Sequence, residues 1–431
     1  MSRVVVLGAG LTGLSTAWHL AQRGVAATVL ERHGRPGGAC RTFEVDGFHF
    51  DLTGHLLHLA RPESRALLRR LGLGGAFRRH RRRAGVALAG RVTPYPIQIH
   101  THRLPAEVRR ECLLGFVEAR LADRGGETDG FTDWVLQRFG AGFARHFFLP
   151  YNRKLYCTDP AELTTEWVGR YVPKPDLADV VDGALGLFPA SRAIGYNATF
   201  LYPRAGGIAV LGEALAARLP GLRLGSPVRA LRLGERSLEL ESGERMEWDT
   251  LIATAALSDL AALSVDLPAG LREAAAQLRA VAVVNLNLGV RGRAPRREHW
   301  LYVAEERFPF YRVGFPSNHG RLAPDGHHTV SVEVSVPAGA PAPADLADRC
   351  IAGLVELGAL RDPDEVAVRA EARIDPAYVV FDRHRPLAVA ALRDHLRQAD
   401  VTLAGRWAEW KYSTMEDALW DGATAARRVA P

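Results

Sequence analysis

The chain has 431 residues, of which 47% are hydrophobic and 24% charged, so we expect two or three packed globular units rather than a disordered or fibrous chain. Its net charge of +7 depends on arginine, because lysine occurs only at positions 154, 174 and 411. The densest arginine run, residues 78–83, has no interleaved aromatic residues and indicates a solvated face rather than a nucleic-acid site.

The first thirty residues have the pattern of a βαβ unit. Val4–Leu7 is a continuous apolar run, as expected of a strand buried on both faces. Residues 11–21 then carry apolar side chains at helical spacing, and Gly24 ends the predicted helix. Val25–Leu30 is a second apolar strand.

A glycine-rich turn joins the first strand to the helix. Gly8, Gly10 and Gly13 form a G-x-G-x-x-G pattern, and Glu31 ends the second strand. Glycines at these positions permit a tight turn and let the backbone approach a pyrophosphate, which the helix N-terminus stabilises. A carboxylate at Glu31 can accept hydrogen bonds from ribose hydroxyls. The context therefore predicts a dinucleotide-binding site.

The later elements alternate between helical and strand patterns. Residues from about 105 to 185 are mostly helical, and residues 206–257 return to a helix and short strands with a hairpin near Ser242. Residues 279–336 alternate like strands. A last strand precedes a helix from about Thr414, where Ser413, Thr414, Met415 and Glu416 match a capping box.

A second glycine pair, Gly37 and Gly38, follows Glu31 in ERHGRPGGACRT. This extension resembles the signature of FAD enzymes of the glutathione-reductase-like and amine-oxidase-like superfamily. The resemblance implies that the pair lets the backbone pass the cofactor, that Arg41 lies near the phosphates and that the C-terminal helix N-terminus faces the flavin. It implies FAD binding by Gly8, Gly10, Leu11, Thr12, Gly13, Glu31, Arg32, Gly38, Ala39, Arg41, Gly54, His55, Val228, Gly405, Arg406, Ser413, Met415 and Asp417.

The expected fold class is α/β: a Rossmann-like, glutathione-reductase-like FAD-binding domain with an inserted helical domain and a mixed β-sheet substrate domain. We expect residues 1–60, 196–257 and 400–431 to form the FAD-binding domain. Residues 103–190 are expected to form the helical domain with a mobile flap, and residues 61–102 and 270–399 the substrate domain.

Further motifs extend the resemblance over nearly the whole chain. DLTGHLLHL, TPYPIQ, FLPYNRKLY, GYNATFLYPRAGG, HWLYVAEERFPFYR and the terminal EWKY resemble those of UDP-galactopyranose mutases. The resemblance implies catalytic roles for His55, Arg312, Tyr378 and Tyr412. The resemblance also gives a set of candidate substrate-binding residues: Gln98, Asn152, Tyr156, Arg170, Tyr171, Asn197, Tyr302, Arg312, His319, Tyr378 and Tyr412.

The chemistry of this family implies an isomerase that interconverts the pyranose and furanose forms of a nucleotide sugar, as in galactofuranose formation. Reduced FAD attacks the anomeric carbon through N5, giving a flavin–sugar adduct without net oxidation, and NAD(P)H is a candidate reductant. The protein must then position the sugar and stabilise the departing diphosphate. Arg312 lies in an otherwise apolar strand, where a buried guanidinium needs an anionic partner.

The substrate side departs from the family pattern. Tyr171 stands where the family has a second diphosphate arginine, with Arg170 adjacent, and His319 replaces a tyrosine. An FAD-dependent oxidoreductase of the amine-oxidase or protoporphyrinogen-oxidase type, acting on a non-nucleotide substrate, therefore stays open. A flavin-stabilised binding protein without catalysis is a third alternative.

Other partners follow from composition. The cysteines, Cys40, Cys112, Cys157 and Cys350, lack metal-ligand spacing and indicate reduced thiols in a cytoplasmic protein without a metal site. No apolar run reaches the roughly 18 residues of a membrane span. We expect a small-molecule substrate, no nucleic-acid partner and no membrane span, while the oligomeric state, including a homo-oligomer, stays open.

Overall fold

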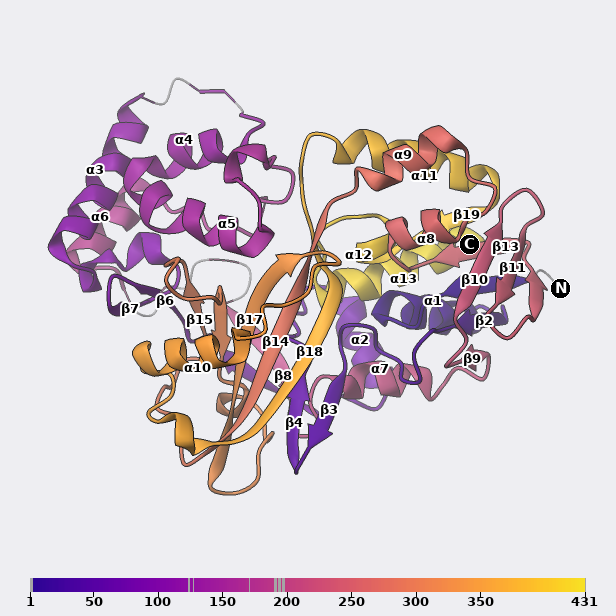
Figure 1. Ribbon diagram of the computed structural model, residues 1–431, viewed down its shortest axis with the longest axis horizontal. Coiled ribbons are helices and arrows are strands. Elements are labelled where there is room, and N and C mark those ends of the chain that lie inside the picture. The colour runs from indigo at the N-terminus through magenta and orange to yellow at the C-terminus, as the bar shows by residue number, and fades with distance from the viewer. Residues whose placement is uncertain are drawn as a thin grey trace.

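The computed structural model describes residues 3–122, 125–126, 128–169, 171–189, 192, 195 and 198–430. Its first unit is a parallel sheet assembled from distant parts of the chain (Figure 1). The strand order is β19 (Val401–Leu403), β13 (Thr250–Ala253), β1 (Val4–Leu7), β2 (Ala27–Leu30) and β9 (Leu222–Arg223). All neighbouring pairs are parallel. The predicted βαβ unit is therefore confirmed, although β2 starts later than the apolar run.

Two helices pack closely beside this sheet: α1 (Leu11–Ala21) and α13 (Met415–Val429). A Cβ atom built on Gly422 of α13 would lie 2.5 Å from the Thr12 carbonyl oxygen of α1. Only glycine permits this approach of one helix to the other. The last helix of the chain is thereby fixed against the first.

A central sheet of mixed direction forms the second unit. Its strand order is β18 (Val366–Val379), β14 (Ala280–Arg291), β17 (His327–Pro337), β16 (Arg312–Gly314), β15 (Trp300–Val303), β6 (Ala84–Leu88) and β7 (Arg91–Pro94). Valine and leucine at alternating positions of β14 and β17 pack in one apolar core with α10 (Leu346–Glu356). The opposite face carries polar side chains, which line part of the site.

The third unit is helical and contains α3 (Ala106–Ala122), α4 (Phe131–Phe143), a π-helical turn (Ala144–Phe148), α5 (Leu149–Tyr156) and α6 (Leu177–Leu185) (Figure 1). Lys154 of α5 forms hydrogen bonds with the backbone at and after β15 of the central sheet. Its ammonium donates to the carbonyl oxygens of Val303, Glu305 and Phe310 at 3.1, 2.9 and 2.5 Å. These bonds satisfy otherwise buried carbonyls and fix the helical unit beside β15.

Smaller elements complete the fold. They are the pairs β3 (Thr42–Val45) with β4 (Phe48–Asp51) and β5 (Phe77–Arg81) with β8 (Thr199–Pro203), the sheet β10 (Val228–Arg232), β11 (Ser237–Leu240) and β12 (Arg245–Glu247), and the helices α2 (Pro62–Arg70), α7 (Ala209–Ala216), α8 (Leu257–Leu263), α9 (Ala269–Ala276), α11 (Arg385–Gln398) and α12 (Gly405–Ala408). The turn between β11 and β12 confirms the expected hairpin near Ser242. In the described part of the chain, no helix is long and apolar enough to cross a membrane.

Two expected domain boundaries differ from the observed packing. Leu67, Leu68 and Leu71 share the apolar core of α1 and β1, so α2 belongs with the dinucleotide-binding sheet rather than with the substrate sheet. Leu392 and Leu396 place α11 in the core around β13 and β19. Both helices lie in segments assigned to the substrate domain, because helical spacing reveals an apolar face but not its partner.

The cap of α13 lies one residue later than expected. Thr414, not Ser413, is the N-cap: its hydroxyl accepts from the Asp417 amide at 3.2 Å, and the Asp417 carboxylate accepts from the Thr414 amide at 3.0 Å. Glu416 instead accepts from the amides of Ala60 and Arg61. Both Ser413–Glu416 and Thr414–Asp417 match the capping-box pattern. The buried Glu416 carboxylate already accepts from the Ala60 and Arg61 amides, and Asp417 forms the capping box.

Candidate functional site

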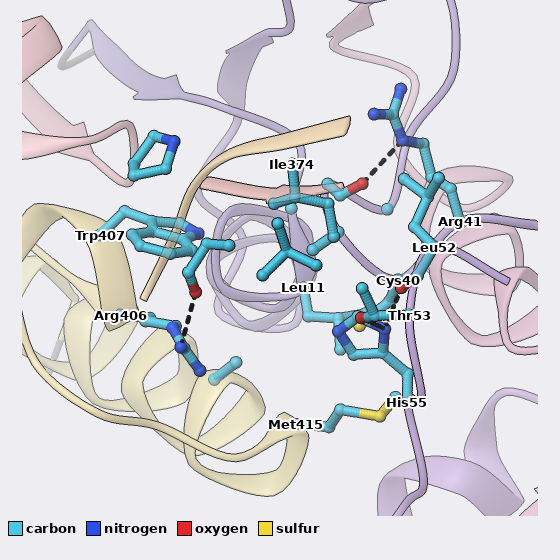
Figure 2. A pocket seen from close by; sticks show the side chains of 18 of the residues that line it. Leu11, Cys40, Arg41, Leu52, Thr53, His55, Ile374, Arg406, Trp407 and Met415 are labelled. Atoms are coloured by element: carbon cyan, nitrogen blue, oxygen red, sulfur yellow. Dashed lines mark hydrogen bonds between the residues drawn. The ribbon is translucent and has the colours of Figure 1, made fainter. Parts of the chain in front are cut away.

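A cavity of about 920 Å³ extends from the carboxyl ends of β1 and β2 to the polar face of the central sheet. This volume falls within the roughly 300–1,000 Å³ that is common for ligand sites. Its lining includes Gly8 and Glu31 at one end and Glu333 at the other. Figure 2 shows the middle of the cavity, where Met415 lies beside His55 and Arg406 lies on the other side, next to Trp407.

The glycine-rich turn forms one end. Gly8 has φ +100°, and a Cβ built on Gly13 would lie 1.9 Å from the Gly8 carbonyl oxygen. Gly38 (φ +60°) passes so near that its Cβ would lie 3.0 Å from the Gly10 Cα. Both glycine pairs therefore meet at the helix N-terminus, as the motifs predicted, and leave a backbone-lined cradle suited to a pyrophosphate.

Glu31 and Arg41 flank this cradle. Glu31 is 6% exposed, and its oxygens accept from the amides of Ala9 and His33 at 2.8 and 2.9 Å. Each carboxylate oxygen keeps a further acceptor site, which fits a ribose hydroxyl. Arg41 donates to the Gly38 carbonyl at 2.7 Å (Figure 2). Arg32, Ala39 and Val228 also line this part of the cavity.

His55 lies on the loop after β4. Its Nδ1 is 2.7 Å from the Leu52 carbonyl oxygen, so Nδ1 carries the proton and Nε2 is left as an acceptor (Figure 2). Burial lowers the pKa of His55 to about 4, although the bond to Leu52 opposes this effect. The ring is therefore neutral at neutral pH, and it cannot serve as a cation there.

Arg406 is the cation on the opposite wall. It donates to the carbonyls of Ala377 and Ser413 at 2.8 and 3.2 Å, and its guanidinium lies over the rings of Tyr378 and Tyr412. Among the described residues, no carboxylate forms an ion pair with it. Its Nε is buried and has no hydrogen-bond partner in the described part of the chain. Such a group favours an anion in the adjacent cavity.

Arg312, in contrast, has an internal anionic partner. Its Nε and Nη2 donate to Glu333 Oε1 at 2.9 and 2.5 Å, and Nη2 also donates to Oε2 at 2.6 Å. Glu333 is 3% exposed. The buried guanidinium of Arg312 was expected to need an anionic partner, and Glu333 provides one within the protein. Nη1 makes no bond to a described residue and remains available to a ligand.

Aromatic residues complete this end of the cavity. Tyr302, Tyr378, Tyr412 and His319 all line it. The Tyr171 ring meets the Tyr412 ring edge-on with centroids 4.4 Å apart. Tyr171 is therefore close enough to influence the cavity without lining it in this conformation.

Other predicted contacts lie away from the cavity lining. Gln98 and Asn152, the latter within α5, are buried, and their amide nitrogens donate to the carbonyls of Pro173 and Phe148, respectively. Their amide oxygens have no partner among the described residues. Tyr156 is also buried and packs against Trp167. Arg170 and Asn197 lie outside the described residues.

Three predicted cofactor residues have structural positions instead. Gly13 and Gly405 are needed for close packing, since a Cβ on Gly405 would lie 2.4 Å from Thr12 Oγ1, and Asp417 caps α13. None of the three lines the cavity. Glycines at contact points between elements produce the same sequence pattern as glycines beside a ligand.

Glu333 and Asn285 were not among the site residues predicted from the sequence. Both project from the polar face of the central sheet, which also carries Asn287 and Ser331. The signal was present, because VVNLNLGV and TVSVEVSV place polar residues at every second position of apolar runs. No group of three or more His, Cys, Asp or Glu side chains suited to a metal occurs among the residues that the structure describes.

Comparison with known proteins identifies the superfamily of this architecture. The family model for flavin containing amine oxidoreductase matches residues 11–430. A solved structure of reduced UDP-galactopyranose mutase matches 100% of this chain and 95% of that chain, with a TM-score of 0.92 and 26% identity.

Curated relatives match only locally. Protoporphyrinogen oxidase 2 from Arabidopsis thaliana is 42% identical over 71 residues, which cover 16% of this chain and 14% of that protein. The zeta-carotene-forming phytoene desaturase from Myxococcus xanthus is 48% identical over 50 residues, covering 12% of this chain and 10% of that protein. Because the matches cover so little of either relative, they do not assign the activity of these proteins to this chain.

The first prediction concerns the cradle. Gly10 has φ −70° and ψ 176°, and its Cβ would approach nothing nearer than the Gly38 Cα at 3.9 Å, so Gly10→Val should fold. The valine side chain would occupy the space needed by the pyrophosphate. We expect flavin absorbance per protein to fall to near zero after gel filtration. Gly34→Val, at a site with no atom within 4 Å, is the control. Normal flavin content in Gly10→Val would contradict this placement.

The second prediction concerns His55. Because its folded pKa is about 4 and its ordinary value 6.5, the unfolded chain binds the proton more readily in this window. The free energy of unfolding should therefore fall as the pH falls from about 6.5 to 4. His55→Gln should show a smaller loss over this range in denaturant titrations at equal flavin content. Exposed His384→Gln should retain the wild-type dependence; equal slopes in all three proteins would refute the assignment.

Proposed function

The chain belongs to the flavin containing amine oxidoreductase family, and within this family we propose that it is an FAD-dependent mutase that interconverts the pyranose and furanose forms of a nucleotide sugar. The observation that carries the proposal is the likeness to reduced UDP-galactopyranose mutase over the full chain. The match covers the whole chain and so includes the central sheet and the helical unit. The central sheet forms the wall of the cavity at the end far from the dinucleotide turn. The shape of the substrate chamber therefore supports the proposal as well as the cofactor end.

The residues fit FAD in a defined orientation. The backbone around Gly8, Gly10 and Gly38 would hold the pyrophosphate, and Glu31 would accept from the adenosine ribose. The flavin ring would lie between the Thr53–His55 loop and the N-terminus of α13. When bound and reduced, FAD supplies a nucleophilic ring nitrogen for attack at an anomeric carbon.

The α13 N-terminus and Arg406 provide positive potential at the flavin end. The helix dipole and the guanidinium, which forms no ion pair with a described carboxylate, both favour negative charge there, in a region where low exposure limits screening by water. Neutral His55 contributes a hydrogen-bond acceptor through Nε2. These residues would favour an electron-rich cofactor ring, which is the state that the mutase reaction requires.

The part of the cavity lined by Arg312 and the tyrosines, two of which lie under Arg406, is suited to a leaving group that carries oxygen atoms. Nη1 of Arg312 and the hydroxyls of Tyr302, Tyr378 and Tyr412 are hydrogen-bond donors on or beside the cavity. In our proposal they hold the diphosphate while the sugar is detached and then return it to the same carbon. Their role is positioning and charge stabilisation, so no side chain is consumed.

One observation favours a second candidate, an FAD-dependent oxidoreductase acting on a non-nucleotide substrate. Glu333 neutralises Arg312, and Tyr171 stands at the place of a second arginine, so these two positions offer little formal positive charge to a diphosphate. A neutral or weakly charged substrate would be compatible with this balance. The local matches to oxidoreductases are consistent with that candidate.

The third prediction separates these candidates. With dithionite present and oxygen excluded, the purified enzyme should convert UDP-galactopyranose to the furanose form over many turnovers, as measured by chromatography, without stoichiometric flavin oxidation. The oxidised enzyme should show no conversion, because the nucleophilic form of the flavin is absent. Oxygen consumption and peroxide release with a substrate, together with no isomerisation under reducing conditions, would decide for the oxidoreductase.

The fourth prediction tests the reduced charge of the substrate wall. Tyr171 lies against Tyr412, so an arginine at position 171 can place its guanidinium near the cavity. A charge-assisted hydrogen bond contributes about 1.5–3 kcal/mol, and Tyr171→Arg should therefore bind UDP roughly tenfold or more tightly in calorimetry. Tyr171→Gln, of similar length without the charge, should show no such gain. Unchanged affinity in Tyr171→Arg would argue against a diphosphate in this part of the cavity.

A further inference from the structure

Three neighbouring strands carry a polar row across the cavity face of the central sheet. Arg312 of β16 is directly opposite Glu333 of β17, and Glu333 is directly opposite Asn285 of β14. Directly paired residues project to the same face, so the three side chains lie side by side. Asn285 is fully buried, and Glu333 is 3% exposed. Polar groups in such a position are expensive unless all their bonds are satisfied.

The row holds the loop that carries His55. The Thr53 amide donates to Asn285 Oδ1 at 2.9 Å, and the Gly54 amide donates to Glu333 Oε1 at 3.1 Å. Asn285 is itself held by Ser331 Oγ and the Val332 carbonyl. Thr53 has φ +62°, an unfavourable value for a β-branched residue, which persists only where neighbours enforce it. The loop conformation therefore depends on acceptors supplied by the sheet.

Glu333 is shared between this loop and the substrate wall. Oε1 accepts from Gly54 and from Arg312, while Oε2 accepts from Arg312 and, at 2.5 Å, from the Tyr311 hydroxyl. A carboxylate has about four acceptor sites, so these donors occupy its capacity. A change in the hydrogen bonds between Glu333 and Arg312 must therefore alter the hydrogen bond from the Gly54 amide to Glu333.

We propose that Glu333 is a positioning residue that couples anion binding at Arg312 to the Thr53–His55 loop beside the flavin. An anion at Nη1 draws the guanidinium towards the cavity and weakens its bonds to Glu333. The carboxylate then accepts more strongly from Gly54 and tightens the loop. By thermodynamic reciprocity, a loop that is held tightly increases the affinity of the site for an anion. This inference rests on the proposed function only in taking the substrate to carry an anionic group.

The experiment titrates the oxidised holoenzyme with pyrophosphate and with UDP, following binding by calorimetry and the flavin environment by its visible difference spectrum. In the wild type, each anion that binds should perturb the flavin spectrum. Glu333→Gln removes the competing charge from Arg312, so pyrophosphate should bind on the order of tenfold more tightly, within the range typical of coupled sites. The spectral change per bound anion should be largely lost, because the link to Gly54 no longer responds.

Glu333→Asp is the second variant, for the case that Glu333→Gln does not fold. It keeps the buried charge opposite Arg312 but is too short to reach both Arg312 and Gly54. We expect pyrophosphate binding with little spectral change. Ser335→Ala, two residues along the same face of β17, is the control and should behave as the wild type. A full spectral response in the folded Glu333 variants would overturn the coupling.

Two outcomes separate this inference from the proposed function. If the wild-type enzyme binds pyrophosphate with a spectral change but converts no nucleotide sugar, the coupling is supported and the mutase function is rejected. If the wild-type enzyme converts UDP-galactose and binds UDP without any spectral change, the mutase function is supported and the coupling is rejected. Failure of both pyrophosphate and UDP to bind the wild type also overturns the coupling.

Discussion

The parallel order β19-β13-β1-β2-β9 is the constraint on which the rest of the molecule depends. Its strands come from the start, the middle and the end of the chain, so every other unit is an insertion whose ends return to this sheet. Parallel strands present their carboxyl ends at one edge, which is where ligands bind in such folds. The central sheet and the helical unit can therefore enclose a ligand only by closing over that edge, and the cavity lies there.

The charges within this enclosure are distributed unequally. Arg312 is neutralised by a buried carboxylate, whereas the contacts of Arg406 with described residues are to carbonyl oxygens and aromatic faces. The stronger attraction for an anion therefore lies at the flavin end, near the N-terminus of α13. With FAD in the proposed orientation, such a distribution would favour a reduced, electron-rich cofactor more than a highly charged substrate. It is compatible with a mutase, which needs a reduced cofactor throughout, and equally with a hydride acceptor.

Sequence patterns predicted the features that depend on neighbouring residues. The glycine turn, the two first strands and the last helix follow from spacing within short segments, and the likeness of the cofactor segments to known FAD enzymes agrees with the family match. The partner of a helix is not encoded in its own periodicity, so the positions of α2 and α11 were misassigned. Glu333 was missed for a related reason: it meets Arg312 and Asn285 only through the register of three strands.

The pairing of Arg312 with Glu333 also changes how the departure at Tyr171 is to be understood. Viewed by sequence alone, the loss of one arginine leaves one full positive charge for a diphosphate. In the folded protein that remaining charge is shared with a carboxylate, so tyrosine hydroxyls and Nη1 of Arg312 would have to bind a diphosphate largely through directed hydrogen bonds. Such bonds depend on geometry more steeply than charge attraction does. A site of this kind selects its ligand by shape and donor position, which makes the setting of the Tyr302, Tyr378 and Tyr412 hydroxyls more important than net charge for the identity of the substrate.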